Sequence, residues 1–320
     1  MEKVLVIVGQ TAVGKTAMSI KLAKALNGEI INGDAMQVYK ELNIVTDKIK
    51  PEQMDGVVHH LLDIKTINED YSVEEYQSNI RRVISEVTAR GKLPIIVGGT
   101  GLYVKAALYD YTFQKETISN KDVEELYKDK TNDELYEILL SLDPKSAESI
   151  HKNNRRRVLR AIAIYNATGK KKSDIIEEQK HEMLYDAIII GLDLDKEIIN
   201  HKIDVRIEEM FNEGLIEEVK NNQTSTTASK AIGYKEVMSY LNNEITLTEA
   251  KDLMKIHTHQ YAKRQRTWFK NQFEVNWVLN DKQAYYNIIN IVEEKWGKLS
   301  WVKLEFQKNI NQLVQLSTFG

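Results

Sequence analysis

The sequence KVLVIVGQTAVGKT, residues 3–16, restricts the fold more than any other part of the chain. A valine-rich apolar run leads into a glycine, four variable positions and then Gly-Lys-Thr. This is the G-x-x-x-x-G-K-[ST] pattern of phosphate-binding loops. The segment that follows, Thr16–Leu26, has apolar residues at helical spacing. The sequence therefore predicts a buried parallel strand at Val4–Val8, a phosphate loop, and a helix whose N-terminus faces the anion.

The residue types of this loop suit an anionic ligand. Glycines let the backbone approach the ligand closely, and the backbone N–H groups then surround it. Lys15 adds a positive charge, and the Thr16 hydroxyl can bind the Mg²⁺ that bridges phosphate oxygens. We therefore predict that a diphosphate or a nucleotide contacts the whole loop, with Thr16 as the metal ligand. The loop consists of Gly9, Gln10, Thr11, Ala12, Val13, Gly14, Lys15 and Thr16.

The first third of the chain alternates strands with helices, which is typical of a parallel sheet with crossover helices. Further strands are predicted at Glu29–Asn32, Leu61–Ile64 and Leu93–Val97, and a helix at Val73–Arg90. After about Tyr111 the pattern is helical, with helices expected at Thr131–Leu142, after Asp143-Pro144, and at Arg155–Thr168. The strand signal returns at Ala187–Ile190. It is followed by helices near Lys202–Lys220, Lys230–Tyr240 and Thr248–Asn271 and by a strand at Val275–Leu279.

These patterns predict an α/β fold of the P-loop NTPase type, in which helices flank a parallel sheet. Residues 1–112 and 183–320 form the predicted catalytic core, with helices towards the C-terminus. Residues 113–182 form an inserted, entirely helical domain. The region after Asp281 alternates polar and apolar residues and predicts no chemistry.

Composition excludes several classes of protein. The chain of 320 residues contains no cysteine, which excludes disulfides, zinc–cysteine sites and thiol nucleophiles. It has no apolar stretch of about 18 residues, so we expect no membrane span. The first strand begins almost at the first residue, which leaves no room for a signal peptide. We therefore expect a cytoplasmic protein.

Two segments contain basic residues and no acidic residue, namely His151–Lys172 and His257–Gln272. The net charge of the whole chain is only −3, but basic residues are concentrated in these two segments. This uneven distribution indicates a surface for a polyanion such as RNA. Solvated helix faces are the alternative interpretation.

Two further features belong to the carboxyl ends of predicted strands, the edge where open α/β sheets bind ligands. The sequence GGTG, with Thr100 between its glycines, follows Leu93–Val97, and glycines there suggest that another group approaches the backbone closely. Asp34 follows Glu29–Asn32, and its carboxylate could bind Mg²⁺, orient a nucleophile or accept its proton. A tight turn and a helix cap are the respective alternatives.

The usual metal-binding aspartate of a motor-type NTPase is missing. Leu93–Val97 ends in glycines, and Asp193 after IIIGL is a possible substitute. The sequence therefore favours group transfer over hydrolysis.

The set GQTAVGKT, INGDAMQVY, HHLLDI, GGTGLY, NNRRRVLRAI…TGK, AIGYKE and AKRQRTWF, in this order, resembles the tRNA dimethylallyltransferases. The motifs span roughly residues 4–280. The resemblance implies transfer of a five-carbon prenyl group from dimethylallyl diphosphate to the exocyclic amine of the adenine 3′ of a tRNA anticodon. Diphosphate is the leaving group and Mg²⁺ the cofactor. The phosphate loop would thus hold the leaving group.

The resemblance also implies roles for particular residues. Asp34 would be the base, Thr100 would hydrogen-bond near the amine, and Lys15 and Arg206 would stabilise the diphosphate. The implied partners are the tRNA anticodon stem-loop and dimethylallyl diphosphate, and we expect a monomer. The implied tRNA-contacting residues are Asp34, Ala35, Met36, Gln37, Thr100, Arg156, Arg157, Val158, Leu159, Arg160, Lys230, Gly233, Tyr234, Lys235, Lys263, Arg264 and Gln265.

The chain departs from the family pattern at several positions. It has Gln10 and Val13 where proline and serine are common, Ala35 in place of serine, and Ala163 in place of a frequent glutamate. The family sequence GTAKP appears as VTDKI, residues 45–49. We expect none of these changes to touch the base or the phosphate loop.

Two other classes of function remain open on the sequence. A P-loop small-molecule kinase would explain the first hundred residues but not the two basic segments. A non-catalytic RNA-binding protein with a relic phosphate loop would bind tRNA without releasing diphosphate.

The loop assignment predicts the effect of Lys15→Ala. Use of the prenyl donor should weaken because one charge-assisted phosphate contact, worth roughly 1.5–3 kcal/mol, is lost. Affinity for tRNA should change little because Lys15 faces phosphate oxygens. Separate measurements of donor and tRNA binding check this, and the reverse pattern would mean that the loop is misassigned.

Overall fold

The computed structural model describes residues 1–111, 113, 120–178 and 182–298. Contacts divide the chain into two units, residues 1–108 with 184–320 and residues 109–183. The part of the first unit that the structure describes contains a six-stranded sheet in the order β3-β2-β4-β1-β5-β6, and all neighbouring strands are parallel. The strands are β1 (Lys3–Gly9), β2 (Gly28–Asn32), β3 (His59–His60), β4 (Leu93–Val97), β5 (Asp186–Asp193) and β6 (Asn276–Leu279). This confirms the predicted α/β fold.

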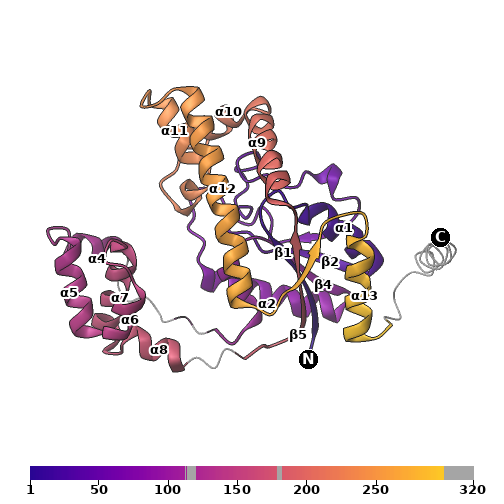
Figure 1. The fold of residues 1–320 in the computed structure, drawn as a ribbon, viewed down its shortest axis with the longest axis horizontal. Helices are drawn as coiled ribbons and strands as arrows, with labels where there is room; N and C mark the ends of the chain where they lie inside the picture. The colour runs from indigo at the N-terminus through magenta and orange to yellow at the C-terminus, as the bar shows by residue number, and fades with distance from the viewer. Residues whose placement is uncertain (112, 114–119, 179–181, 299–320) are drawn as a thin grey trace. The chain divides into compact units, whose positions relative to one another are not determined.

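Helices cover the sheet in the first unit (Figure 1). They are α1 (Lys15–Ala25), α2 (Val73–Ala89), α3 (Gly101–Leu108), α9 (Lys196–Asn212), α10 (Leu215–Asn221), α11 (Tyr234–Leu241), α12 (Leu247–Gln272) and α13 (Ala284–Trp296), with two short 3₁₀ turns, Pro51–Gln53 and Thr227–Lys230.

The strand order determines which face each helix covers. The chain passes from β1 through α1 to β2 in one direction across the sheet, and from β3 through α2 to β4 in the other. Because parallel crossovers are right-handed, α1 and α2 lie on opposite faces. Accordingly α1 packs with α13, whereas α2 packs with α3, which also contacts α12. Strand β1 is central, and Val4–Val8 are fully buried.

The carboxyl ends of β2 and β4 are joined closely by their backbones. The Gly33 N–H donates to the Val97 carbonyl at 2.8 Å, and the Thr100 N–H donates to the Gly33 carbonyl at 3.3 Å. A Cβ atom on Gly98 would lie 2.2 Å from the backbone of Gly33. The glycine therefore permits the contact that brings the loop with Asp34 beside the loop with Thr100.

The second unit is helical in the part that the structure describes. Its helices are α4 (Asn120–Leu126), α5 (Asn132–Leu142), α6 (Pro144–Ser149), α7 (Arg155–Thr168) and α8 (Lys172–Glu178). Leu135, Leu139, Val158 and Ile162 are fully buried at its core. Thr131 and Glu134 form the expected capping box of α5, and Gly169 ends α7 in a left-handed conformation.

Several sequence predictions of elements need correction. The strand expected at Leu61–Ile64 is wrong, since Leu61 and Asp63 have positive φ, and only His59–His60 pair with β2. The single helix expected near Lys202–Lys220 is two helices, divided at Gly214, whose φ is +105°.

Two other boundaries also differ from the prediction. The helix expected from Lys230 begins at Tyr234, after a 3₁₀ turn. The region after Asp281 contains α13, which the sequence reading did not predict, and residues 299–320 lie outside the described residues.

The contact between Gly33 and Gly98 predicts the effect of Gly98→Ala. The added methyl group must displace backbone, so we expect the free energy of unfolding to fall by about 2 kcal/mol or more. Gly91→Ala is the control, because nothing lies within 4 Å of its Cβ position, although its φ of +71° makes alanine cost about 1 kcal/mol. Urea unfolding monitored by circular dichroism measures both. Equal losses would refute the steric argument.

Candidate diphosphate-binding and transfer site

The phosphate loop connects β1 to α1 and presents its charge at the helix N-terminus. Gly14 precedes the first helical residue in a left-handed conformation, and Lys15 begins the helix. The Lys15 ammonium bends back and donates to the carbonyls of Gly9, at 3.0 Å, and Gln10, at 2.8 Å. Burial and the nearby Arg206 lower the pKa of Lys15 to about 8, although Asp34 and Asp47 oppose this shift. Keeping this ammonium charged therefore costs free energy, and a bound anion would offset that cost.

Arg206 reaches the same loop from α9. One terminal guanidinium nitrogen donates to the Thr11 hydroxyl at 2.9 Å, and the other donates to Asp47 at 2.8 Å. The Arg206 Nε atom is buried and has no hydrogen-bond partner among the described residues. The structure therefore places the second expected cation at the loop. It also corrects the expectation for VTDKI, because Asp47 contacts this cation directly.

Asp34 lies between the phosphate loop and the GGTG loop. Its carboxylate accepts from the Met36 N–H at 2.8 Å, and the Thr100 hydroxyl accepts from the Ala35 N–H at 3.1 Å. Burial raises the pKa of Asp34, while the Met36 N–H and the charge of Lys15 hold it down. A carboxylate with a raised pKa is a stronger proton acceptor than an ordinary one, so the position suits a general base.

One side chain from α12 connects the two loops. The Gln265 amide accepts from the Thr11 N–H at 2.8 Å and donates to the Gly99 carbonyl at 3.0 Å. A Cβ atom on Gly99 would lie 2.0 Å from the Gln265 amide nitrogen, so glycine is needed for this contact. Gln265 is only 5% exposed. The amide therefore joins the phosphate loop to the GGTG loop from a buried position.

Two cavities meet at these groups. One, of about 430 Å³, is lined by the phosphate loop and contains Lys15, Thr16 and Asp47. The other, of about 360 Å³, contains Thr100, Lys230 and Arg264. The residues that line both are Thr11, Asp34, Thr46, Arg206 and Tyr261. Asp34 can therefore act on a ligand in the second cavity while an anion occupies the first.

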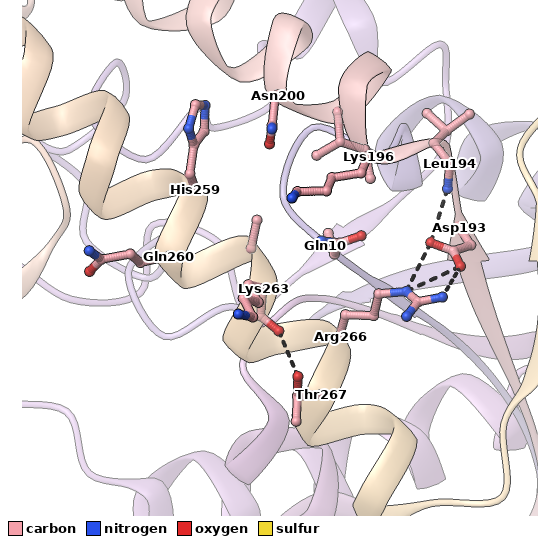
Figure 2. A pocket seen from close by; sticks show the side chains of 12 residues that line it. Gln10, Asp193, Leu194, Lys196, Asn200, His259, Gln260, Lys263, Arg266 and Thr267 are labelled. Carbon is pink, nitrogen blue, oxygen red and sulfur yellow. Dashed lines mark hydrogen bonds and ion pairs between the residues drawn. The ribbon is translucent and has the colours of Figure 1, made fainter.

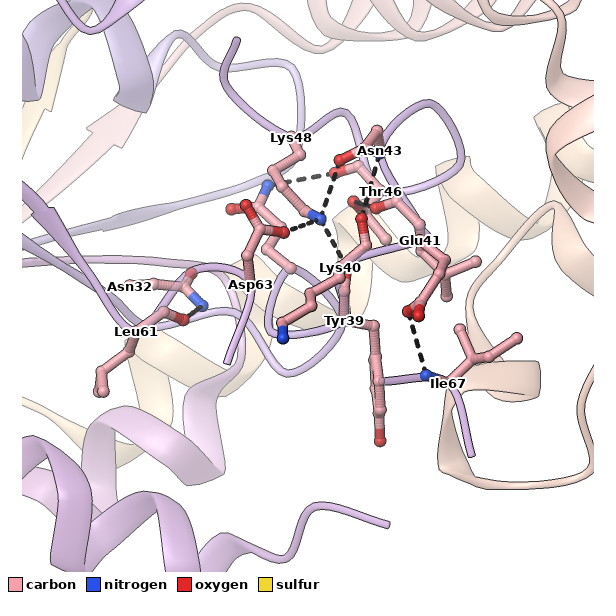
Figure 3. Close-up of polar contacts among 12 residues, drawn as sticks. Asn32, Tyr39, Lys40, Glu41, Asn43, Thr46, Lys48, Leu61, Asp63 and Ile67 are labelled. Carbon is pink, nitrogen blue, oxygen red and sulfur yellow. Dashed lines mark hydrogen bonds and ion pairs between the residues drawn. The ribbon is translucent and has the colours of Figure 1, made fainter. Parts of the chain in front are cut away.

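Polar contacts of Lys48 anchor the loop that carries Thr46 and Asp47 (Figure 3). The Lys48 side chain is 3% exposed, and its ammonium donates to Asp63 at 2.6 Å, to the Tyr39 carbonyl at 2.5 Å and to Asn43 at 3.0 Å. These contacts fix the backbone that precedes and follows Asp47.

A third cavity of about 600 Å³ lies on another side of α12 (Figure 2). It is lined by Asp193 and Arg266, which pair at 2.6 Å, and by Lys196, His259 and Lys263. Asp193 was considered as a substitute for the missing metal-binding aspartate. It does not line the cavity that contains Thr16, and Arg266 occupies its carboxylate.

The residues near the phosphate loop fit Mg²⁺ only together with a ligand. No cluster of three or more acidic or histidine side chains forms a metal site in the described ranges. The exposed Thr16 hydroxyl and the carboxylates of Asp47 and Glu209 line the cavity. Mg²⁺ commonly binds one or two protein groups together with substrate phosphates, so this sparse donor set suits it.

The residues predicted to contact tRNA fall into two groups. Val158, Leu159, Gly233, Tyr234 and Gln265 are buried, so they belong to the interior of the units. Tyr234, for example, accepts from the Thr224 N–H and donates to the Asn222 carbonyl. Exposed members are Arg156, Arg157, Lys230, Lys235, Lys263 and Arg264, while Asp34, Ala35, Met36, Gln37, Thr100 and Arg160 are partly exposed. For these exposed and partly exposed residues, tRNA contact stays a prediction.

Sequence reasoning missed Tyr261 and Asp47. Tyr261 lines both cavities, and burial together with the charge of Asp34 raises the pKa of its hydroxyl. Its spacing was the available signal, since Tyr261, Arg264 and Gln265 lie at i, i+3 and i+4 and so share a helix face. Asp47 had no such signal, because its partner Arg206 is 159 residues away.

The fold and this site define a P-loop protein of the α/β class, with a phosphate-binding motif at the edge of its sheet. The model of the family described as IPP transferase matches residues 37–272. The chain belongs to that family.

Individual relatives agree with this assignment. The chain is 50% identical over 316 residues to the tRNA dimethylallyltransferase of Anoxybacillus flavithermus, covering 97% of this chain and 99% of the relative. The tRNA isopentenylpyrophosphate transferase of Bacillus halodurans is 39% identical, with a TM-score of 0.71 over 92% of this chain and 97% of that one. A eukaryotic dimethylallyltransferase acting on tRNA is 29% identical, with a TM-score of 0.79 over 96% and 84%. Within the described ranges, no helix has the length and apolar character to span a membrane.

The lowered pKa of Lys15 predicts a pH dependence of anion binding. Lys15 is protonated below about pH 8 in the empty site, and its charge is lost as the pH rises above that value. The ratio of the pyrophosphate affinities of the native protein and Lys15→Met should therefore be constant below pH 8 and fall towards one above it. Taking the ratio cancels the titration of pyrophosphate itself. Calorimetry at several pH values measures it, and a ratio unchanged up to pH 10 would contradict the pKa assignment.

Proposed function

We propose that the protein transfers the dimethylallyl group from dimethylallyl diphosphate to the exocyclic amine of the adenine 3′ of the anticodon in tRNA, with release of diphosphate. The observation that carries this proposal is the position of Asp34. Its carboxylate lines both the cavity with the phosphate loop and the cavity with Lys230 and Arg264. A reaction between a phosphorylated donor and a second substrate needs a residue that can reach both, as one that lines both cavities can.

The phosphate-loop cavity suits the donor. As the allylic C–O bond breaks, its electron pair moves to the diphosphate, where negative charge develops. Lys15, Arg206 and the backbone N–H groups of the loop are positioned to stabilise that charge. Mg²⁺ bound at Thr16 would neutralise part of the charge of the diphosphate.

The second cavity suits the base. The adenine amine is a weak nucleophile because its lone pair is delocalised into the ring. If Asp34 accepts one amine proton, the lone pair can form the new N–C bond as the C–O bond breaks. Thr100 and Tyr261 lie on the same wall and can orient the base. An enzyme that acts on a base inside a loop must turn that base out of the stack.

Exposed basic residues of both units would hold the RNA backbone. Lys230 and Arg264 lie at the mouth of the base cavity, and Arg156 and Arg157 are exposed on α7. With tRNA as substrate, a cytoplasmic location and a monomeric enzyme remain our expectations.

The family assignment and the features of the site both argue against a small-molecule kinase and against a non-catalytic RNA-binding protein. A small-molecule kinase would not need the second cavity with its basic rim. A binding protein with a relic loop would not need Lys15 and Arg206 at the loop together with a carboxylate of raised pKa.

Nucleoside analysis tests the function directly. Incubation with dimethylallyl diphosphate, Mg²⁺ and unmodified tRNA should yield an adenosine that has gained C₅H₈, together with one diphosphate per transfer. ATP in place of the donor should give no transfer. Unmodified nucleosides under these conditions would refute the proposal.

Asp34→Asn should lower the transfer rate about 10²–10⁴-fold, because the amide keeps the shape of the side chain but cannot accept a proton. Donor and tRNA affinities should change little if Asp34 acts only in the transition state. Single-turnover kinetics at saturating substrates measure the rate.

Asp195→Asn is the matched control. It caps α9 outside both cavities, and asparagine caps helices as well as aspartate does. Recovery of Asp34→Asn at high Mg²⁺ would point instead to metal binding. Transfer at the native rate by Asp34→Asn would exclude both the general-base role and the metal-binding role of Asp34.

A further inference from the structure

Arg206 is already occupied by an internal carboxylate. One of its terminal nitrogens donates to Asp47 at 2.8 Å, beside the phosphate loop. Asp47 also acts electrostatically on Lys15. Both cations of the site therefore have acceptors supplied by the protein, since Lys15 donates to loop carbonyls. The family pattern GTAKP has alanine at this position, so the carboxylate is a departure of this chain.

We propose that Asp47 is an internal competitor of the diphosphate. It pairs with Arg206 while the site is empty, gives up this pair when the donor binds, and takes Arg206 back as the product diphosphate leaves. The inference rests on the proposed function, because it assumes that a diphosphate binds between Lys15 and Arg206.

The geometry allows Asp47 to leave without moving the loop. Its side chain is 55% exposed, whereas that of Arg206 is 22% exposed, so the carboxylate can turn into water at little cost. The backbone on either side is fixed. The Glu218 carboxylate accepts from the N–H groups of Asn43, Ile44 and Val45, and Lys48 is buried among its partners. The exchange therefore needs only a side-chain rotation.

Charge determines the direction of the effect. A diphosphate that binds Arg206 must first displace Asp47, so part of its binding free energy is spent on breaking that ion pair. The carboxylate therefore weakens the binding of the product as well as that of the donor. Weaker product binding favours turnover, because a cradle without this competitor would retain diphosphate longer.

Asp47→Asn is the test variant. The backbone of Asp47 is left-handed, with φ of +50°, and asparagine tolerates this conformation better than alanine does. The variant keeps the shape and removes the charge. Calorimetry with inorganic pyrophosphate in metal-free buffer should show binding about three- to tenfold tighter than for the native protein. Inhibition of transfer by pyrophosphate should strengthen by a similar factor.

Two comparisons separate competition from general repulsion. Glu209 lines the same cavity, is exposed and has no recorded contact with Arg206, so Glu209→Gln removes a charge without freeing the arginine. We expect a smaller gain in affinity from it. In an Arg206→Ala background the gain from Asp47→Asn should largely disappear, because no pair remains to be broken.

Other outcomes would overturn the inference. Unchanged or weaker pyrophosphate binding by Asp47→Asn in metal-free buffer means that Asp47 is not a competitor. Weaker binding that appears only with Mg²⁺ assigns the carboxylate to the metal instead. If Asp47→Asn raises pyrophosphate affinity as much in the Arg206→Ala background as in the native protein, the carboxylate acts only by repelling the anion and does not compete for Arg206. If neither Lys15→Ala nor Arg206→Ala lowers pyrophosphate affinity, the diphosphate site itself is misassigned, and the proposed function fails with it.

Discussion

The geometry of the site depends on the two hydrogen bonds of the Gln265 amide. One fixes the phosphate loop at Thr11, and the other fixes the GGTG loop at Gly99. These loops follow different strands, and no hydrogen bond of the sheet itself relates their tips. A buried amide from α12 therefore links the phosphate loop to the loop that carries Thr100. Because the amide is buried, loss of either partner would leave a polar group unpaired, at a cost of about 1–3 kcal/mol.

Burial creates the electrostatic properties of the site. It lowers the pKa of Lys15 and raises that of Asp34, so each group is pushed towards its neutral form. Each also attracts the other, and this opposes both shifts. In such a partly desolvated cavity, the Lys15 ammonium can bind an anion, and the neighbouring Asp34 carboxylate can accept a proton. Asp47 lies at the exposed edge of this region, with a side chain that is 55% exposed, so its pair with Arg206 is more strongly screened and easier to break.

The sequence predicted the elements whose causes are local. The phosphate loop and the ends of α5 and α7 follow from glycines and caps within a few residues, and the structure confirms them. The division between α9 and α10 was missed because helical spacing continues across Gly214, and only its φ reveals the break. Leu61–Ile64 looked apolar enough for a strand, but positive φ values at Leu61 and Asp63 prevent pairing.

The site residues also divide into those with a local signal in the sequence and those without one. Lys15 and Thr16 are recognisable from a motif eight residues long, whereas Arg206 came from the family resemblance alone. Gln265 was expected at the RNA surface because the family resemblance implies tRNA contacts in the basic segment that contains it. Its burial against Gly99 depends on how α12 crosses the sheet edge, which no local pattern encodes. Asp47 shows the limit most clearly. A substitution in a loop looked neutral in the sequence, yet the fold brings it to Arg206, the cation proposed to hold the leaving group. If Asp47 competes with the diphosphate as proposed, this one loop residue would set the balance between holding the donor and releasing the product.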